Sequence, residues 1–306
     1  MKKPNLFILG APKCGTTALS HWLSLHPEIY VSKVKEPHYF SEEHKLTPDL
    51  DAYERLFQGA SEKHRWICEA SVWYLFSDTA VANIKSYSPN ARYVVMLRNP
   101  IDLVVSMHEQ HKFNGNELQG DLREALSLND LRSQGCSVDI MAGYSPTAHL
   151  AYYKSCSLGW QLARLYELVP REYVHVILLD DLSIEPQRTY VNLLRFLGVS
   201  EKLPKAFEKI NPAKTRRSFF LDAVVLRLAN LKSKMGIRKR FWLLAWLRRW
   251  NVRYVERGAI PTDLLQEMSE RFRPDVQQLS ILLERDLGAW GSPNKSVVEA
   301  SSENAV

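Results

Sequence analysis

Short apolar runs alternate with segments of helical periodicity along most of the chain. Four runs have the length of buried strands: 5–10, 66–70, 93–97 and 173–179. Apolar residues at helical spacing predict helices at 18–25, 101–112, 152–168, 185–197 and 264–287. This alternation predicts an α/β fold with a central parallel sheet and helices on both of its faces. Because ligands of such sheets bind beyond the carboxyl ends of the strands, the residues that follow each run are the first candidates for a site.

Two stretches depart from this alternation, and the last residues are polar. Residues 114–146 are rich in Gly, Asn and Ser and are a candidate substrate-facing loop. Residues 219–260 predict basic helices that form either a lid or an acceptor-binding region. We expect one domain over residues 1–291, followed by a disordered tail at 292–306, which is rich in Ser, Glu and Asn.

Positive charge is concentrated in one part of the sequence. The formal net charge of the chain is +6, and residues 214–257 contain 13 Lys or Arg against two acidic residues. Such a patch suits an anionic small molecule, an anionic acceptor, a membrane surface or nucleic acid. Apolar residues at 241–247 and Trp250 add a face suited to a peripheral membrane contact. Charge alone does not choose among these partners.

Neither the cysteines nor the N-terminal residues indicate an exported or metal-binding protein. The four cysteines are widely spaced, without a CxxC pair or a Cys/His cluster, which favours reduced thiols and no metal site. The apolar run at 6–9 is interrupted by Pro12 and Lys13, so it is too short for a signal peptide. No stretch approaches the ~18 apolar residues of a membrane span. We therefore expect a cytoplasmic protein without a membrane span.

A glycine-bounded loop follows the first predicted strand. Residues 10–17 read Gly-Ala-Pro-Lys-Cys-Gly-Thr-Thr and have the GxxxxG spacing of a P-loop. The lysine that a P-loop places after its second glycine is replaced by Thr16, and a lysine stands inside the loop as Lys13. The backbone N–H groups of Gly15, Thr16 and Thr17 would begin a helix, where aligned peptide dipoles bind a phosphate.

A nucleotide kinase is the first alternative function, and two features of the sequence argue against it. A kinase needs a lysine on the β- and γ-phosphates and a strand-terminal Asp for Mg²⁺. The run at 93–97 ends instead in Arg98 and Asn99. Arg98 offers a planar fork of donors to a phosphate.

These two motifs carry a resemblance to a known family. The loop at 10–17 resembles the 5′-phosphosulfate-binding loop of the sulfotransferases that use 3′-phosphoadenosine 5′-phosphosulfate (PAPS), and residues 93–106 resemble their 3′-phosphate-binding segment. The resemblance implies a P-loop NTPase-like sulfotransferase fold, PAPS as the co-substrate and adenosine 3′,5′-bisphosphate (PAP) as the product. It places the donor on Lys13, Cys14, Gly15, Thr16, Thr17, Ala18, Arg98 and Ser106. A late basic loop at 211–218 adds Lys214, Arg216 and Arg217.

A third motif lies between the first two. Residues 35–40 read Lys-Glu-Pro-His-Tyr-Phe and are similar to the KEPHFF segment of bacterial and glycan-modifying sulfotransferases, those of heparan sulfate included. The resemblance implies that Glu36 is the general base and that His38 supports the acceptor or the base. It also implies that Lys13 stabilises charge on the oxygen that bridges phosphorus and sulfur. In-line displacement at sulfur by such groups needs no metal.

Other interpretations of these residues stay open. Without the flanking motifs, Glu36 is a solvated loop acid paired with Lys33 or Lys35, and His38 is a packed structural group. Trp73 lies in a stretch that resembles another family segment, and it either lines the acceptor or adenine pocket or packs in the core.

The sequence leaves the acceptor open. Hydroxyls of sugars, natural products and lipids are all compatible with the motifs, as is an amine. The expected partners are therefore PAPS and a small-molecule or glycan acceptor, without nucleic acid. A nucleic-acid- or membrane-binding protein built around the basic patch at 214–257 is the alternative from another class.

Overall fold

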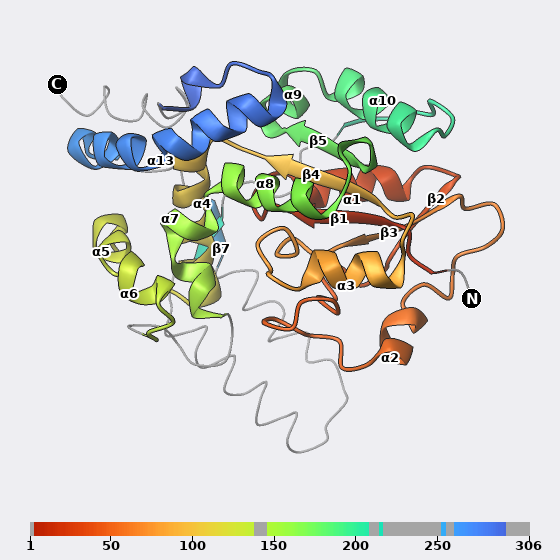
Figure 1. Cartoon of the computed structure of the whole chain (residues 1–306), viewed down its shortest axis with the longest axis horizontal. Coiled ribbons are helices and arrows are strands. Elements are labelled where there is room, and N and C mark those ends of the chain that lie inside the picture. The colour runs from red at the N-terminus through yellow and green to blue at the C-terminus, as the bar shows by residue number, and fades with distance from the viewer. Residues whose placement is uncertain (1–2, 138–145, 208–213, 217–251, 255–259, 292–306) are drawn as a thin grey trace.

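A parallel sheet of five strands forms the centre of the computed structural model (Figure 1). The structure describes residues 3–137, 146–207, 214–216, 252–254 and 260–291. In spatial order the strands are β2 (Ile29–Val31), β3 (Trp66–Ala70), β1 (Leu6–Gly10), β4 (Arg92–Leu97) and β5 (Val174–Leu178). Each strand pairs in parallel with its neighbours, so the carboxyl ends of all five lie at one edge of the sheet.

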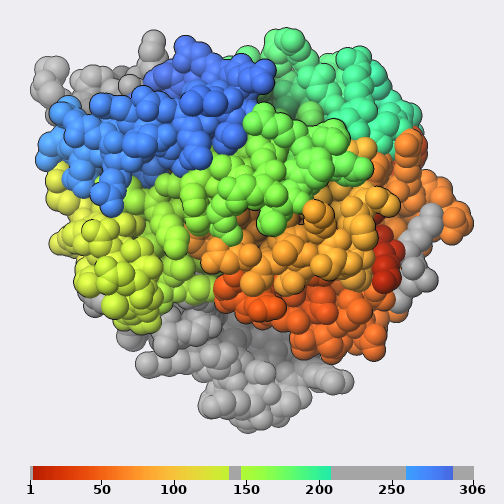
Figure 2. All heavy atoms as spheres, in the orientation of Figure 1, coloured from red at the N-terminus to blue at the C-terminus, as the bar shows by residue number. Residues whose placement is uncertain are grey.

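Helices cover both faces of this sheet. The longer ones are α1 (Thr16–Ser24), α3 (Ala80–Tyr87), α4 (Pro100–Asn114), α8 (Leu158–Leu168), α10 (Pro186–Leu197) and α13 (Thr262–Leu283). The shorter ones are α2 (Leu50–Arg55), α5 (Leu122–Ser127), α6 (Asn129–Ser133), α7 (Tyr152–Ser155) and α9 (Leu179–Ile184). In Figure 1, α3 and α8 pass in front of the sheet and α1 lies behind it. Figure 2 shows α13 (blue), α8 (green) and the segment that contains α3 (orange) packed side by side over the front face.

The four predicted strands are confirmed. They could be recognised because strands that are buried on both faces consist almost entirely of apolar residues. All five residues of β1 are buried, as are all but the first residue of β4. Parallel strands covered on both faces read as continuous apolar runs, so the four predicted strands agree with the observed bounds to within one residue at each end. β2 was missed because its three residues are too few to produce such a run.

The helix predicted at 152–168 is two helices, α7 and α8. Asp275 of α13 accepts hydrogen bonds from the backbone N–H groups of Gly159 (2.9 Å) and Trp160 (2.8 Å), and so caps the first turn of α8. A Cβ atom at Gly159 would lie 2.4 Å from the Asp275 carbonyl oxygen, so this approach requires glycine. The cap comes from a distant part of the chain, where a local pattern cannot reveal it.

Three other predictions differ from the structure. The terminal helix predicted at 264–287 ends earlier, because Glu284 adopts the left-handed conformation with φ 52°. The candidate loop at 114–146 contains α5 and α6, and residues 138–145 lie outside the described residues. The prediction of basic helices over 219–260 is wrong for residues 252–254. These residues form the strand β7 (Val252–Tyr254), which pairs antiparallel with β6 (Lys214–Arg216).

The remainder of the basic region, at 217–251 and 255–259, lies outside the described residues, as does the predicted tail at 292–306. The lid and the tail therefore stay predictions, as does the assignment of residues 1–291 to one domain.

A buried ion pair joins the segments that follow α4. The side chains of Arg132 on α6 and Glu117 are fully buried, and hydrogen bonds of 2.6 and 2.8 Å connect the guanidinium to the two carboxylate oxygens. The hydroxyl of Tyr152 on α7 donates to the same carboxylate at 3.0 Å. A buried charge is strongly destabilising once its partner is removed. These contacts therefore hold α6 and α7 against the end of α4.

Replacing Glu117 with Gln should destabilise the protein, because Arg132 would keep its charge without a counter-ion. We expect the free energy of unfolding in urea titrations to fall by about 3–5 kcal/mol. The exposed pair formed by Glu185 and Arg188 provides the control, and Glu185→Gln should change stability by less than about 1 kcal/mol. Equal losses in the two variants would contradict this role of the buried pair.

Candidate active site

The loop after β1 has the backbone shape of an anion-binding loop. Gly10 has φ 140°, and a Cβ atom there would lie 2.3 Å from the carbonyl oxygen of Val72. Gly15 has φ 90° and is the N-cap of α1, and no side chain caps this helix. Both conformations favour glycine. The first-turn N–H groups of α1 therefore lack a side-chain acceptor, which is the arrangement that binds a phosphate.

Lys13 and Arg98, two of the cations predicted to hold the donor, meet at this loop. The N–H of Ala11 donates to the carbonyl oxygen of Met96 at 2.8 Å and ties the loop to β4. Arg98 follows β4, and its Nη1 donates to the carbonyl oxygen of Lys13 at 3.4 Å. The Lys13 ammonium donates to Oε1 of Gln110 on α4 at 2.9 Å. Both charges are thus held at the carboxyl edge of the sheet.

The other side chains of the loop differ in what they offer to a donor. Cys14 is fully buried, its thiol donates to the carbonyl oxygen two residues earlier, and burial raises its pKa to about 12. Thr16 and Ala18 are buried as well. Thr17 is only partly buried, and its Oγ1 accepts a hydrogen bond from Lys35 at 2.7 Å. Cys14 and Ala18 can therefore contact a donor through their backbone alone, whereas Thr17 also presents its hydroxyl.

α4 carries the other part of the predicted donor site. The helix begins after Asn99, whose side chain accepts from the N–H of Ile101 at 3.0 Å and caps it. Asp102, in the first turn, lies 3.8 Å from Nη2 of Arg98 and keeps that guanidinium beside the helix. Ser106 is buried on the same helix. The joint action of Arg98 and Ser106 on one phosphate stays a prediction.

The late basic residues lie on a strand rather than in the predicted loop. Lys214 and Arg216 are the ends of β6, which is held in register by its hydrogen bonds to β7. The backbone of β6 lies beside α4, the helix that carries Ser106. Arg217 lies outside the described residues. The strand thus brings the basic segment to the helix that the donor site needs, although the pairing was not apparent from the sequence.

A strained turn carries Glu36 and His38, and the end of β3 holds it. Both residues have left-handed backbone conformations, with φ of 60° and 45°. The N–H of Glu36 donates to the carbonyl oxygen of Ala70, and the N–H of His38 donates to Oγ of Ser71, each at 3.0 Å. Ser71 in turn donates to Oε1 of the buried Glu69 at 2.5 Å, and burial raises the pKa of Glu69 to about 7. Strained backbone of this kind persists only where the surroundings hold it, and it is common at active sites.

The Glu36 carboxylate has a positive or polar partner at each oxygen. Oε1 accepts from the Lys35 ammonium at 2.8 Å, and Oε2 lies 3.7 Å from Nε2 of His38. Burial acts to raise the pKa of Glu36, but the contact with His38 and the hydrogen bond and charge of Lys35 outweigh it and lower the pKa to about 2. The carboxylate is therefore ionised at neutral pH. Lys35, and not the exposed Lys33, is its partner.

Aromatic and histidine rings form a packed row behind this turn. The ring of His38 stacks on His44 at 4.6 Å, His44 contacts His149 edge-on at 5.1 Å, and His149 stacks flat on Trp73 at 3.5 Å. Burial lowers the pKa of His44 to about 4, so this ring is neutral at physiological pH. Trp73 is mostly buried in this row. The rings fix His38 sterically, as expected of a packed structural group, and its support of the acceptor or the base stays a prediction.

The sequence analysis missed three hydrogen bonds that position the candidate residues. Lys35 donates to Thr17, Lys13 donates to Gln110, and the backbone N–H of His38 donates to the side chain of Ser71. Gln110 lies four residues after Ser106 on a predicted helix, so helical spacing was a usable signal. The roles of Lys35 and Ser71 depend on which strands are neighbours, and no local pattern carries that information.

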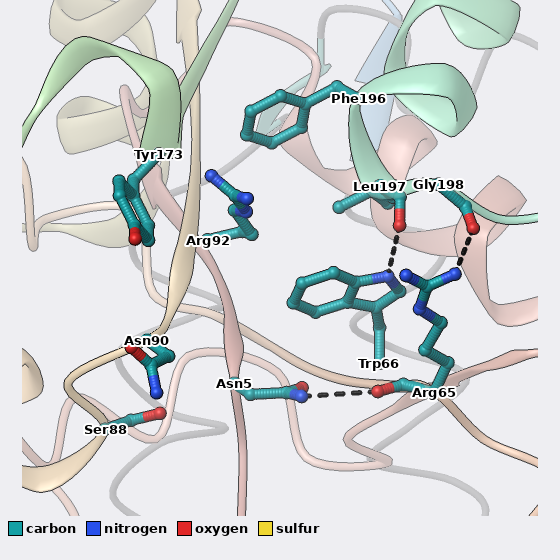
Figure 3. Close-up of a pocket in the computed structure, with 10 residues that line it drawn as sticks. All are labelled: Asn5, Arg65, Trp66, Ser88, Asn90, Arg92, Tyr173, Phe196, Leu197 and Gly198. Atoms are coloured by element: carbon teal, nitrogen blue, oxygen red, sulfur yellow. Dashed lines mark hydrogen bonds between the residues drawn. The ribbon is translucent and has the colours of Figure 1, made fainter.

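A cavity of about 480 Å³ lies at the opposite, amino edge of the sheet (Figure 3). Trp66 Nε1 donates to the carbonyl oxygen of Leu197 at 2.8 Å, and Arg65 donates to that of Gly198, so both satisfy the last carbonyl groups of α10. The Arg92 guanidinium packs against the rings of Tyr173 and Phe196. Interactions within the fold thus explain the polar groups of this cavity, and it is separate from the candidate active site.

Among the residues that the structure describes, no three His, Cys, Asp or Glu side chains converge as a metal ion would require. No helix in this part of the chain is both long and apolar enough to cross a bilayer.

Comparisons with known proteins show the family to which this chain belongs. The family model described as "Sulfotransferase domain" matches residues 3–239. The crystal structure of a sulfotransferase from Alicyclobacillus acidocaldarius superimposes with a TM-score of 0.69 and 28% sequence identity, over 95% of this chain and 99% of that one. The chain therefore belongs to the sulfotransferase family, and the predicted family and P-loop-like α/β fold are confirmed.

Curated relatives are more distant and longer. Carbohydrate sulfotransferase 15 from Homo sapiens is 24% identical over 267 residues, which are 70% of this chain and 47% of that protein. Bifunctional heparan sulfate N-deacetylase/N-sulfotransferase 1 from Homo sapiens is 24% identical over 212 residues, 65% of this chain and 22% of that protein. The chain thus spans about half the length, or less, of the curated relatives that it matches.

Proposed function

We propose that this protein transfers a sulfuryl group from PAPS to a hydroxyl or amine of an acceptor and releases PAP. One observation carries the proposal. An ionised carboxylate, Glu36, is joined through the side chain of Lys35 to the first-turn hydroxyl of an uncapped helix, with Lys13 on the adjoining loop and Arg98, at the end of β4, in contact with that loop. A proton acceptor therefore lies next to an anion-binding loop, as transfer between an acceptor and a phosphosulfate requires.

The donor would be held by the loop and by α4. The backbone N–H groups at the start of α1 and the Thr17 hydroxyl bind the 5′-phosphate in this proposal. Arg98 and Ser106 bind the 3′-phosphate, and β6 adds Lys214 and Arg216 with Arg217 directly after it. These assignments come from the family resemblance, and the position of Arg98 against the phosphate loop supports them.

In the transfer step, Glu36 takes the proton from the acceptor as the acceptor atom attacks sulfur. The bond between sulfur and the bridging phosphate oxygen breaks, and that oxygen leaves with its electron pair as part of PAP. Lys13 stabilises the charge that develops there. His38, held by the ring row, keeps Glu36 in place through its contact with Oε2. Each step uses groups of this chain, so the proposed reaction does not need a metal.

A glycan is the acceptor that we favour. Carbohydrate sulfotransferase 15 and the heparan sulfate N-sulfotransferase, by their names, act on carbohydrates. The basic residues of 214–257 would attract an anionic glycan. Natural-product and lipid acceptors are the alternatives, and a cytoplasmic location stays a proposal from the sequence.

The end of β4 argues against a nucleotide kinase. A kinase needs a carboxylate directly after this strand to bind Mg²⁺. Asn99 occupies that position, and its side-chain oxygen is used as the cap of α4.

The purified protein should bind PAP and transfer ³⁵S from labelled PAPS to a glycan acceptor. Isothermal titration calorimetry with PAP, with and without EDTA, measures the first step, and chromatography of labelled sulfated and unsulfated glycan chains measures the second. We expect EDTA to change neither result. Absence of PAP binding, or binding that requires Mg²⁺, would overturn the proposed function.

Lys13→Ala and Glu36→Gln should each lower kcat by about 10²–10⁴-fold, because one removes charge stabilisation of the leaving oxygen and the other removes the base. The affinity of Glu36→Gln for PAP should stay within about tenfold of the wild-type value, since Glu36 does not bind the donor. Lys33→Ala is the control for loss of a nearby lysine and should keep wild-type kcat. Near-wild-type turnover of Glu36→Gln would refute its assignment as the base.

Arg98→Ala should remove the preference for a 3′-phosphate. We expect the Kd for PAP to rise about tenfold to a hundredfold, the usual effect of losing a charge-assisted hydrogen bond, while the Kd for adenosine 5′-phosphate stays nearly constant. Arg92→Ala, at the other end of β4, is the matched control. An unchanged ratio of the two Kd values in Arg98→Ala would remove Arg98 from the 3′-phosphate site.

A further inference from the structure

One lysine side chain connects the two halves of the candidate active site. The Lys35 ammonium donates to Oγ1 of Thr17 at 2.7 Å and to Oε1 of Glu36 at 2.8 Å. Thr17 lies in the first turn of α1, where a donor phosphate would bind, and Glu36 lies on the turn held by β3. Lys35 therefore contacts the donor side and the proton acceptor at the same time.

This arrangement keeps Glu36 a weak base while the donor site holds no anion. Among the charged and titratable groups around the carboxylate, Lys35 contributes an ammonium and His38 a ring nitrogen. His44 and the buried Glu69 also interact with it electrostatically from neighbouring segments. The contacts with Lys35 and His38 hold the pKa of Glu36 near 2, well below the value of a useful base at neutral pH.

Lys35 is able to change partners. About a third of its side chain is exposed, and a lysine head group rotates on four flexible bonds. A donor phosphate bound by the N–H groups of α1 would lie beside Thr17, within reach of the ammonium that Thr17 already contacts. The phosphosulfate group of PAPS carries two negative charges, one on phosphorus and one on sulfur, and the 5′-phosphate of PAP carries up to two, against one on the Glu36 carboxylate, so either group competes for the lysine.

We propose that Lys35 is a positioning residue that couples donor binding to activation of the base. Its ammonium moves from Oε1 of Glu36 to the 5′-phosphate oxygens when the donor binds. The move frees Glu36 to take the acceptor proton and adds positive charge at the group that leaves. Glu36 thus becomes an effective base only after the donor is in place. This inference rests on the proposed function, because it needs a donor phosphate at Thr17.

The test is a titration of the Glu36 carboxyl carbon by ¹³C NMR, with the resonance assigned by its loss in Glu36→Gln. The titration is carried out without ligand and with saturating PAP, in the wild type, in Lys35→Met and in Lys33→Met, which removes an exposed lysine two residues away. In the wild type, PAP should raise the pKa of Glu36 from near 2 toward the ordinary value of about 4.3. In Lys35→Met the pKa should be high without ligand, and PAP should raise it by less than half as much.

Affinity supplies the second measurement. If the ammonium moves to the phosphate, Lys35→Met should bind PAP about tenfold more weakly, while Lys33→Met and Lys35→Arg should stay within about threefold of the wild type. Lys35→Arg should also retain the response of Glu36 to PAP. A role limited to tying α1 to the catalytic turn would leave the PAP response of Glu36 the same in Lys35→Met and the wild type.

The outcomes separate this inference from the proposed function. Failure of the wild type to bind PAP would overturn both. If the wild type binds PAP but PAP raises the pKa of Glu36 equally in the wild type and in Lys35→Met, the lysine stays with Glu36 and the coupling is overturned alone. A PAP affinity of Lys35→Met equal to that of Lys33→Met would overturn the coupling in the same way.

Discussion

The pairing of β1 between β3 and β4 is the constraint on which the candidate active site depends. Because the three strands are parallel and adjacent, their carboxyl ends lie together, and each end supplies one part of the site. β1 leads into the loop that carries Lys13, β4 leads into Arg98, and the end of β3 holds the turn of Glu36. These residues come from three separate stretches of sequence and share an edge only because the sheet is ordered β3-β1-β4.

Helix α4 extends this arrangement from the sheet to the donor. Gln110 on α4 holds the Lys13 ammonium, Asp102 holds the Arg98 guanidinium, and Ser106 lies between them in sequence. β6 brings the late basic segment to the same helix. One helix therefore holds both Lys13 of the phosphate loop and Arg98 at the end of β4, and a shift of α4 would move them together.

Burial and charge act against each other at the catalytic turn. Desolvation alone would favour a protonated Glu36, as it does for Glu69 nearby, but Lys35 and His38 keep Glu36 ionised. The same contacts that hold Glu36 ionised make it a poor proton acceptor. In the proposed reaction Glu36 would have to lose one of these partners, and an anionic donor beside Thr17 would take Lys35 from it.

The sequence by itself determined four of the five strands of the central sheet, most of the longer helices and the residues of the three motifs. Apolar runs report burial on both faces of a sheet, and glycines at positions 10 and 15 report the backbone shape of the loop. Only the tertiary structure decided that α8 is capped by Asp275, that Lys214–Arg216 is a strand, and that Lys35 bridges Thr17 and Glu36. The physical reason is that burial, helical periodicity and turn geometry depend on residues that are neighbours in the sequence. A hydrogen bond between distant segments depends instead on the order of the strands in the whole sheet.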